Sequence, residues 1–443
     1  MSERWSRPHL LGNRKRWFYL GMGVKRWLVV LTLGAALTGM GFVYLLLLAQ
    51  RSGLLPMMVY RVLTLQFLPT FWRMVLSLIA GALIIFLAVV RLGANLLEPF
   101  RRPGDSVATS LYYHSRRSRG PYIVAIGGGT GLPSLLRGLK EHTSNITAIV
   151  TVADDGGSSG RLRQELGLLP PGDFRNNIAA LSRDEALMTQ VLQYRFGGKT
   201  GTNHRGELRG HAFGNLLLAA LSGVTGSFDE ALLAAERVLA MRGRVLPSTL
   251  ELVTLIAEVA VEGRAGTVRV AGESSIPKSG GRIREVYLEP DEARAYPPAV
   301  QAILQADLVV IGPGSLYTSI LPNLLVAGVA EALRRTRARI VYVCNLAIQP
   351  GETDNYSVAD HVDVILRHVG SACLDFVVAN DNVVPSQNAG STVFVEPGWP
   401  PSRAAGKLRL ITADLVDEVR PWRHDSEKLA QVIERILEDN VGG

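Results

Sequence analysis

The chain has 443 residues, of which 47% are hydrophobic, and it carries a formal net charge of +8 at pH 7. The positive charge is confined to residues 1–119, which hold 16 Lys or Arg against three Asp or Glu, while the remainder holds 31 against 36. The length favours more than one structural unit, and the acidic balance of the larger part argues against nucleic acid as its partner.

Two long apolar runs occupy the N-terminal region. Residues 27–49 contain no charged side chain, and residues 71–92 are apolar apart from an arginine near each end. Helices of this length span a bilayer core of about 30 Å. The first run is too long for the core of a cleaved signal peptide, and neither run has the polar face of a soluble helix. We therefore expect a membrane region over residues 1–100, with spanning helices at about residues 27–49 and 71–92.

The distribution of lysine and arginine predicts the orientation of these helices. Seven basic residues precede residue 27 and five lie within residues 101–119, whereas the connection between the two runs carries only Arg51 and Arg61. Cytoplasmic flanks of membrane helices are enriched in basic residues. The sequence thus predicts a multi-pass protein of the cytoplasmic membrane with both ends in the cytoplasm, and a basic juxtamembrane linker over residues 101–120.

Residues 121–443 show a different pattern, in which short apolar runs break into glycine-rich turns and then take helical spacing. Strands are expected at residues 122–126, 146–153, 306–311, 339–344 and 375–379, with helices at 181–196 and 213–223, a further strand–helix unit at 250–261, and strands at 268–276 and 283–290. This alternation indicates a Rossmann-like, doubly wound α/β domain with a mostly parallel sheet. Cys344 and Cys373 lack the spacing of a metal site or a disulfide framework, so we expect buried thiols.

The first glycine cluster follows the first expected strand of this domain. Its GGGTG sequence could bring backbone N–H groups close to a phosphate at the start of the next helix, although the same glycines also suit a purely structural turn. The residues predicted to bind are Gly127, Gly128, Gly129, Thr130 and Gly131.

A second cluster, DDGGSSGR, follows the next strand. Adjacent carboxylates at a strand end suit Mg²⁺ or sugar hydroxyls, and a glycine–serine loop with an arginine suits an anion. The alternative is a capped loop in solvent. The candidate ligand residues are Asp154, Asp155, Gly156, Gly157, Ser158, Ser159 and Arg161, and Asp154 and Asp155 could hold a metal ion.

Four further clusters supply polar side chains. PPGDFRNN predicts a rigid turn before a helix, GHAFGN a helix start with a histidine, GPGSLYTS a second glycine-rich turn, and NLAIQPGET a strand end with amides. Each also has a structural alternative, such as a helix-capping aspartate or a histidine without a ligand. Open α/β sheets bind ligands outside the carboxyl ends of their strands, so we expect these clusters to share one edge. The candidate residues are Asp173, Arg175, Asn176, His211, Asn215, Gly312, Gly314, Ser315, Tyr317, Thr318, Asn345 and Gln349.

These six motifs occur in the order and spacing of the YvcK-type gluconeogenesis factor family, a branch of the CofD-like superfamily, which the chain resembles over residues 122–437. The resemblance implies a Rossmann-type protein that binds UDP-sugars and is linked to carbon metabolism, cell-wall homeostasis and cell shape. It also implies kinship with 2-phospho-L-lactate transferases, which use Mg²⁺ and a nucleotide diphosphate-linked donor. Those transferases lack much of the GGSSGRLR and PPGDFRN motifs, which places this chain among the regulators.

Two functions are therefore in competition. In the first, a UDP-sugar binds to the domain and changes its contacts with proteins of envelope metabolism. In the second, a Mg²⁺-dependent transferase uses Asp154 or Asp155 to hold the metal and Arg161 to stabilise developing charge, which makes these three the candidate catalytic residues. No nucleophile with its base stands out, and the fingerprint of NAD enzymes is missing. No cofactor beyond Mg²⁺ is indicated, and a homo-oligomer is left open.

Overall fold

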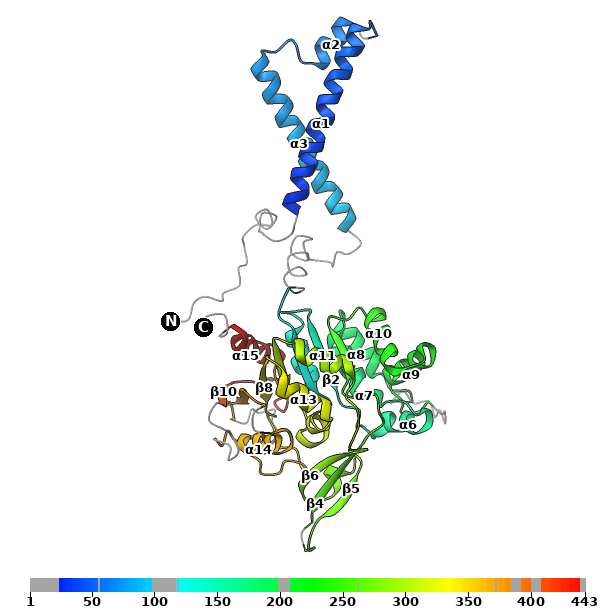
Figure 1. Ribbon diagram of the computed structural model, residues 1–443, viewed down its shortest axis with the longest axis vertical. Helices are drawn as coiled ribbons and strands as arrows, with labels where there is room; N and C mark the ends of the chain where they lie inside the picture. Colours follow the sequence, from blue (N-terminus) through cyan, green and yellow to red (C-terminus); the bar gives the residue numbers. More distant parts are fainter. Residues whose placement is uncertain are drawn as a thin grey trace. The chain divides into compact units, whose positions relative to one another are not determined.

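The computed structural model describes residues 24–54, 56–97, 117, 119–197, 208–261, 263–370, 373–383, 392–399 and 408–438. The chain divides into two compact units, Met1–Arg116 and Arg117–Gly443, which we describe separately (Figure 1). The predicted linker at residues 101–120 lies mostly outside the described residues.

The described part of the N-terminal unit contains the helices α1 (Val24–Arg51), α2 (Met57–Leu63) and α3 (Thr70–Leu97). Within them, Thr32–Arg51 and Thr70–Ala88 are long and apolar enough to cross a membrane. Large apolar side chains on both helices are exposed in this unit, as expected of surfaces that face lipid rather than a protein core. The two apolar helices predicted from the sequence are therefore present.

A seven-stranded sheet forms the centre of the larger unit, and its strands are all parallel. The strand order is β10-β9-β8-β7-β1-β2-β3. Residues in β1 and β7 are buried along their whole length, which explains why these strands are continuous apolar runs rather than alternating ones. The strands are β1 (Ile123–Gly127), β2 (Ile146–Val150), β3 (Arg244–Pro247), β7 (Leu308–Ile311), β8 (Arg339–Val343), β9 (Phe376–Asn380) and β10 (Arg409–Ala413).

The order of the strands reverses between β1 and β7. From β1 the chain proceeds to β2 and β3 on one side, then returns to β7 on the other side of β1 and continues outward to β10. Right-handed crossovers made in opposite directions place their helices on opposite faces of a sheet. Helices α5 and α13 follow β1 and β7, so they cover opposite faces, and the predicted doubly wound α/β fold is confirmed.

Two groups of helices pack on this sheet. Helix α5 contacts α7 and α15, while α11 contacts α13. Both predicted buried thiols, Cys344 and Cys373, are buried and free. The helices are α5 (Leu132–Leu139), α6 (Gly157–Leu166), α7 (Pro171–Leu181), α8 (Glu185–Gln193), α9 (Phe213–Thr225), α10 (Phe228–Val238), α11 (Pro297–Gln305), α12 (Leu321–Leu324), α13 (Ala327–Arg335), α14 (Val358–Val369) and α15 (Ser426–Glu438), with a 3₁₀ turn η3 (Ile276–Lys278) and a π-helical turn η4 (Leu316–Ile320).

The segment between β3 and α11 forms a separate sheet. Strands β4 (Thr254–Ala260), β5 (Val268–Ala271) and β6 (Arg282–Glu289) pair antiparallel in the order β5-β4-β6 (Figure 1). The predicted strand–helix unit at residues 250–261 is therefore wrong, because the chain forms the strand β4 where the helix was expected. A bridge between Thr249 and Ala295 joins the two ends of the segment where it leaves and re-enters the main domain.

The loops that follow β1 and β7 lie directly against each other. A Cβ atom placed on Gly131 would come within 2.6 Å of the carbonyl oxygen of Pro313, and it would also meet the backbone nitrogen of Gly314 at 2.9 Å. Gly131 itself has a φ of −79°, which any residue can adopt. The glycine is thus required by the close approach of two backbones and not by its own conformation.

Substitution of Gly131 should expose this packing requirement. We expect Gly131→Ala to lower the free energy of unfolding of the fragment 117–443 by about 1–3 kcal/mol, because the added methyl group pushes two backbone segments apart. Urea unfolding followed by circular dichroism measures the change.

Gly223→Ala is the matched control. Gly223 lies in α9, and a Cβ atom there meets nothing within 4 Å. This variant should gain up to about 1 kcal/mol, because alanine favours a helix over glycine. Equal destabilisation of the two variants would contradict the packing argument.

Candidate functional site

The loops that follow β1, β7 and β8 contact one another, through a hydrogen bond in one case and through backbone packing in the other. The N–H of Gly314, after β7, donates to Oδ1 of Asn345, after β8, at 3.1 Å. Gly314 also lies beside the loop after β1, through the packing around Gly131. The glycine clusters and the amide predicted from the sequence therefore meet at one edge of the sheet, and the glycine clusters meet at the point where the strand order reverses.

Helix α7 inserts a carboxylate into the first glycine loop. The N–H of Gly129 donates to Oδ2 of Asp173 at 2.7 Å, and Nδ2 of Asn176 lies 3.5 Å from the Gly129 carbonyl oxygen. Burial raises the pKa of Asp173 to about 7, and the nearby charge of Asp154 adds to that increase. One of the N–H groups expected to face a phosphate is thus already occupied by a protein carboxylate.

The aspartates after β2 are held by backbone donors. Oδ1 of Asp154 accepts from the Gly156 N–H at 2.9 Å, and Oδ1 of Asp155 accepts from the Ser274 N–H at 2.9 Å. Burial is the main cause that raises the pKa of Asp154, and the charge of Asp155 also raises it. The Ser159 side chain also hydrogen-bonds to the Asp154 carboxylate, and Oδ2 of Asp155 lies against Gly272.

The predicted loop character of two clusters is wrong. Helix α6 begins at Gly157, so most of the glycine–serine cluster forms the first turn of a helix, and its arginine, Arg161, is exposed. Helix α7 begins at Pro171, so Asp173 and Arg175 lie inside a helix and not in a turn before it. Proline at the first helical position and a carboxylate in the first turn both favour the start of α7.

Beneath this edge, a buried polar network joins α6, α7 and α9. Oγ of Ser158 accepts from Nδ2 of Asn215 at 3.0 Å and lies 3.2 Å from Nδ1 of His211. Oδ1 of Asn215 accepts from the guanidinium of Arg175 at 3.1 Å. Because Ser158 is 5% exposed and its hydroxyl is saturated by neighbours, this serine–histidine pair positions helices and is not arranged as a nucleophile with its base.

A second polar network lies after β7 and β8. Nε2 of Gln349 donates to Oγ of Ser315 at 2.7 Å, and Nδ2 of Asn345 donates to Gln349 at 3.2 Å. Ser315 and Thr318 both donate to Oε1 of Glu352, at 3.5 and 3.3 Å. Burial raises the pKa of Glu352 to about 7.

Tyr317 does not fit its predicted role as a ligand contact. Its side chain is 1% exposed, and its hydroxyl lies 2.8 Å from that of Tyr356. Tyr317 therefore belongs to the core beneath the second glycine loop, where its hydroxyl already has a partner.

Two acidic residues of the site escaped the sequence-based prediction. Glu352 lies within the QPGET segment, beside the amides that were selected. Glu273 comes from the β5–β6 segment, and burial raises its pKa to about 8, with further increases from the charges of Asp154, Asp173, Asp155 and Glu352. The GES turn between two strands was the signal for Glu273, but nothing in the sequence placed that turn beside β2.

Asp154 and Asp155, the predicted metal pair, have few metal-ligating side chains around them. Within the described part of the chain, no three His, Cys, Asp or Glu side chains are grouped so as to hold a metal ion. Asp154 and Asp155 would therefore give a Mg²⁺ ion few protein ligands, and the ion would have to take most of its ligands from water and from substrate phosphates, as Mg²⁺ commonly does.

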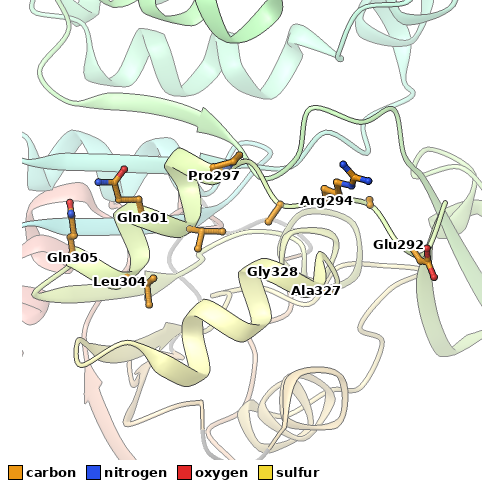
Figure 2. Close-up of a pocket in the computed structure, with 11 residues that line it drawn as sticks. Glu292, Arg294, Pro297, Gln301, Leu304, Gln305, Ala327 and Gly328 are labelled. Atoms are coloured by element: carbon orange, nitrogen blue, oxygen red, sulfur yellow. The ribbon is translucent and has the colours of Figure 1, made fainter.

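A separate hollow of about 670 Å³ lies between α11 and the start of α13 (Figure 2). Its walls are mainly apolar, and Glu292, Arg294 and Gln301 are among the polar residues that line it. None of the predicted ligand residues contributes to it. The strand-end edge, where charged groups and backbone donors converge, is therefore the stronger candidate for a nucleotide.

Comparison with known proteins identifies relatives of both the α/β unit and the whole chain. Residues 123–398 match the family model described as 2-phospho-L-lactate transferase CofD. The "Gluconeogenesis factor" of Bacillus subtilis is 43% identical over 325 residues, which cover 72% of this chain and 99% of that protein. A Nostoc sp. protein named "Putative gluconeogenesis factor" is 41% identical over 439 residues, or 96% of this chain and 93% of that protein, so the match includes the N-terminal region.

A solved structure agrees with these matches. The crystal structure of a member of the UPF0052 family from Bacillus halodurans superimposes with a TM-score of 0.63 at 41% sequence identity, covering 70% of this chain and 99% of that one. The family resemblance predicted from the six motifs is confirmed.

The raised pKa values of the carboxyl groups predict how stability depends on pH. The pKa of Asp173 rises from an ordinary value of 3.8 to about 7 on folding. Between these two pH values the folded protein therefore binds more protons than the unfolded protein. The stability gained by this protonation is present at low pH and is lost as the pH rises through about 7. Glu352 and Glu273 act in the same direction at about 7 and 8.

We expect the unfolding free energy of the fragment 117–443 to fall between about pH 4.5 and pH 8, with Asp173→Asn reducing the slope below about pH 7 by up to about 1.4 kcal/mol per pH unit. Asparagine keeps an oxygen that can accept from Gly129 while losing the titration. Urea unfolding across this pH range measures the slope, and an identical slope in the variant would contradict the assignment.

Proposed function

The chain belongs to the CofD family, and we propose that within it this protein is a UDP-sugar-binding regulator that acts at the cytoplasmic face of the membrane. The observation that carries the proposal is the meeting of the two glycine loops between β1 and β7, where the strand order reverses. Nucleotide ligands of open α/β sheets bind in the crevice at this position.

The diphosphate is assigned to the donors around the first glycine loop. Asp173 already occupies the Gly129 N–H, so the groups assigned to the phosphates are the N–H groups of Thr130 and Gly131 at the start of α5. The positive end of that helix favours an anion. Arg161, exposed on the first turns of α6, supplies a guanidinium for the same charge.

The sugar and the base are assigned to the polar side chains on either side of the diphosphate. The carboxylates of Asp154 and Asp155 have lone pairs beyond those used by their backbone donors, and these can accept hydrogen bonds from sugar hydroxyls. Asn345 and Gln349, after β8, offer both donors and acceptors, which suits the edge of a nucleobase.

A transferase is the second candidate, because the family model that matches the chain is named for one. If Mg²⁺ is bound, Asp154 or Asp155 would hold it, and it would neutralise the charge of the diphosphate. Among the described residues, the Ser158–His211 pair is buried and hydrogen-bonded within its network, which favours a regulator over a catalyst.

The cellular role is proposed from the relatives and from the apolar helices. Relatives at 41–49% identity carry the name gluconeogenesis factor, which supports a role in carbon metabolism, and UDP-sugars are also precursors of the cell wall. Anchoring by two membrane helices would keep the domain where envelope precursors are assembled, so control of cell-wall homeostasis and cell shape through protein partners is included in the proposal. A homo-oligomer is compatible with it.

Calorimetry of the full chain in detergent tests the binding site. UDP-glucose should bind, and Arg161→Ala should weaken that binding about five- to tenfold, because one charge-assisted contact with the diphosphate is lost. Arg237→Ala is the matched control, since Arg237 is exposed on α10 and belongs to no predicted cluster. Binding that is unaffected by Arg161→Ala, or equally weakened by the control, would sink the assignment, and transfer of phospholactate from a nucleotide donor would favour the second candidate.

Cysteine accessibility tests the membrane arrangement. In intact cells, a cysteine introduced at Gly53 should react with an impermeant thiol reagent, whereas one introduced at Ser118 should react only after the cells are opened. The reason is that basic residues concentrate on the segments flanking the two helices, which favours cytoplasmic ends. The opposite labelling pattern would refute this topology.

A further inference from the structure

The segment that connects β5 to β6 crosses above the ends of several strands of the main sheet. At one end, the N–H of Ser274 donates to Asp155, after β2, at 2.9 Å. At the other end, Pro277 lies so close to Gly351, in the loop after β8, that a Cβ atom on that glycine would overlap the Pro277 carbonyl oxygen. Since β7 and β1 lie between β8 and β2, this bridge spans the point where the strand order reverses.

Glycine at position 272 lets the bridge pack directly against the Asp155 carboxylate. Gly272 has a φ of +96°, and a Cβ atom there would overlap Oδ2 of Asp155. The backbone conformation and the close approach both exclude a larger residue. The bridge is thus fixed to the aspartate loop by backbone contacts, and it carries Glu273 at a defined place.

Glu273 adds a further carboxyl group to those already at the strand ends. The charges that act on it come from Asp154 and Asp155 after β2, Asp173 on α7, and Glu352 after β8. These groups belong to different parts of the fold, so Glu273 lies within electrostatic reach of carboxylates on both sides of the bridge.

One of these groups has an unused acceptor. Glu352 is 9% exposed, and its Oε1 accepts hydrogen bonds from Ser315 and Thr318. Its Oε2 is also buried, but it makes no hydrogen bond to any residue that the structure describes. A buried acceptor without a partner is costly, and a hydroxyl donor supplied by a ligand would satisfy it.

We propose that Glu273 is a specificity-determining residue that admits a neutral sugar beneath the β5–β6 bridge and excludes a sugar that carries a carboxylate. This inference rests on the proposed binding of a UDP-sugar. Sugar hydroxyls can donate to the carboxylates, whereas an additional anion in the same partly buried space is repelled by each of them.

UDP-glucose and UDP-glucuronate form a matched pair of probes, because they differ only by a hydroxymethyl or a carboxylate at C6. Calorimetry of the full chain in detergent at pH 9, where Glu273 with its pKa of about 8 is ionised, should show UDP-glucose binding about tenfold or more tightly than UDP-glucuronate. Glu273→Gln should reduce this ratio to about threefold or less, mainly by improving the binding of UDP-glucuronate.

Two controls separate the possible outcomes. Glu285→Gln changes an exposed glutamate on β6 and should keep the wild-type ratio. Binding of UDP alone should be equal in all three proteins, and thermal melts confirm that each is folded. Equal affinity of the wild type for the two sugars, or an unchanged ratio in Glu273→Gln, overturns this inference while leaving the proposed function intact. Failure of UDP and both UDP-sugars to bind overturns the proposed function and this inference with it.

Discussion

Gly131 lets the loop after β1 lie against the carbonyl oxygen of Pro313 in the loop after β7, and the strand-end site is arranged around that contact. Asp173 fixes the first loop through Gly129, and Asn345 fixes the second through Gly314. A side chain between the two backbones would separate the ends of two central strands and displace the groups on both sides. The close approach of two backbones is therefore sufficient to explain part of the glycine-rich sequence, before any ligand is considered.

Five strands of the main sheet could be predicted because they are almost wholly buried, whereas the edge strands β3 and β10 were missed, and β10 is largely exposed or half-buried. Runs such as those of β1 and β7 have no polar residue facing solvent, and glycine-rich turns mark their ends. In the small sheet the error was the strand–helix unit expected at residues 250–261, where the chain forms the strand β4. The strands expected at residues 268–276 and 283–290 are present as β5 and β6. In β6, Ile283, Val286 and Leu288 are buried while Arg284 and Glu285 are exposed, which is the pattern of an antiparallel strand with one solvent face. That pattern identified a strand without showing to which sheet it belonged.

The candidate site was predictable where its residues follow strands, and it was incomplete where they come from other elements. The glycine loops and the aspartates lie at the ends of adjacent parallel strands, so the topology alone brings them together. Glu273 reaches the site from an insertion, and its neighbour Ser274 is separated from Asp155 by 119 positions in the sequence. Tyr317 was selected for its hydroxyl, which the core turned out to satisfy. The starts of α6 and α7 were missed because glycine, serine and proline are poor residues for a helix interior but acceptable in its first turn.

The segment from β3 to α11 leaves and re-enters the main domain at adjacent positions, since Thr249 and Ala295 are bridged and the N–H of Tyr296 donates to the Ser248 carbonyl oxygen at 2.9 Å. The intervening residues therefore form a cassette whose two ends are closed by the domain itself. Such a cassette can diverge, or be exchanged between homologues as one piece, without disturbing the order of the seven strands. Under the proposed function, the strand-end loops and the segment that carries Glu273 can then vary separately as long as the contacts with Asp155 and Gly351 are kept, and chimaeras joined at Thr249 and Ala295 offer a route to redesigning ligand choice.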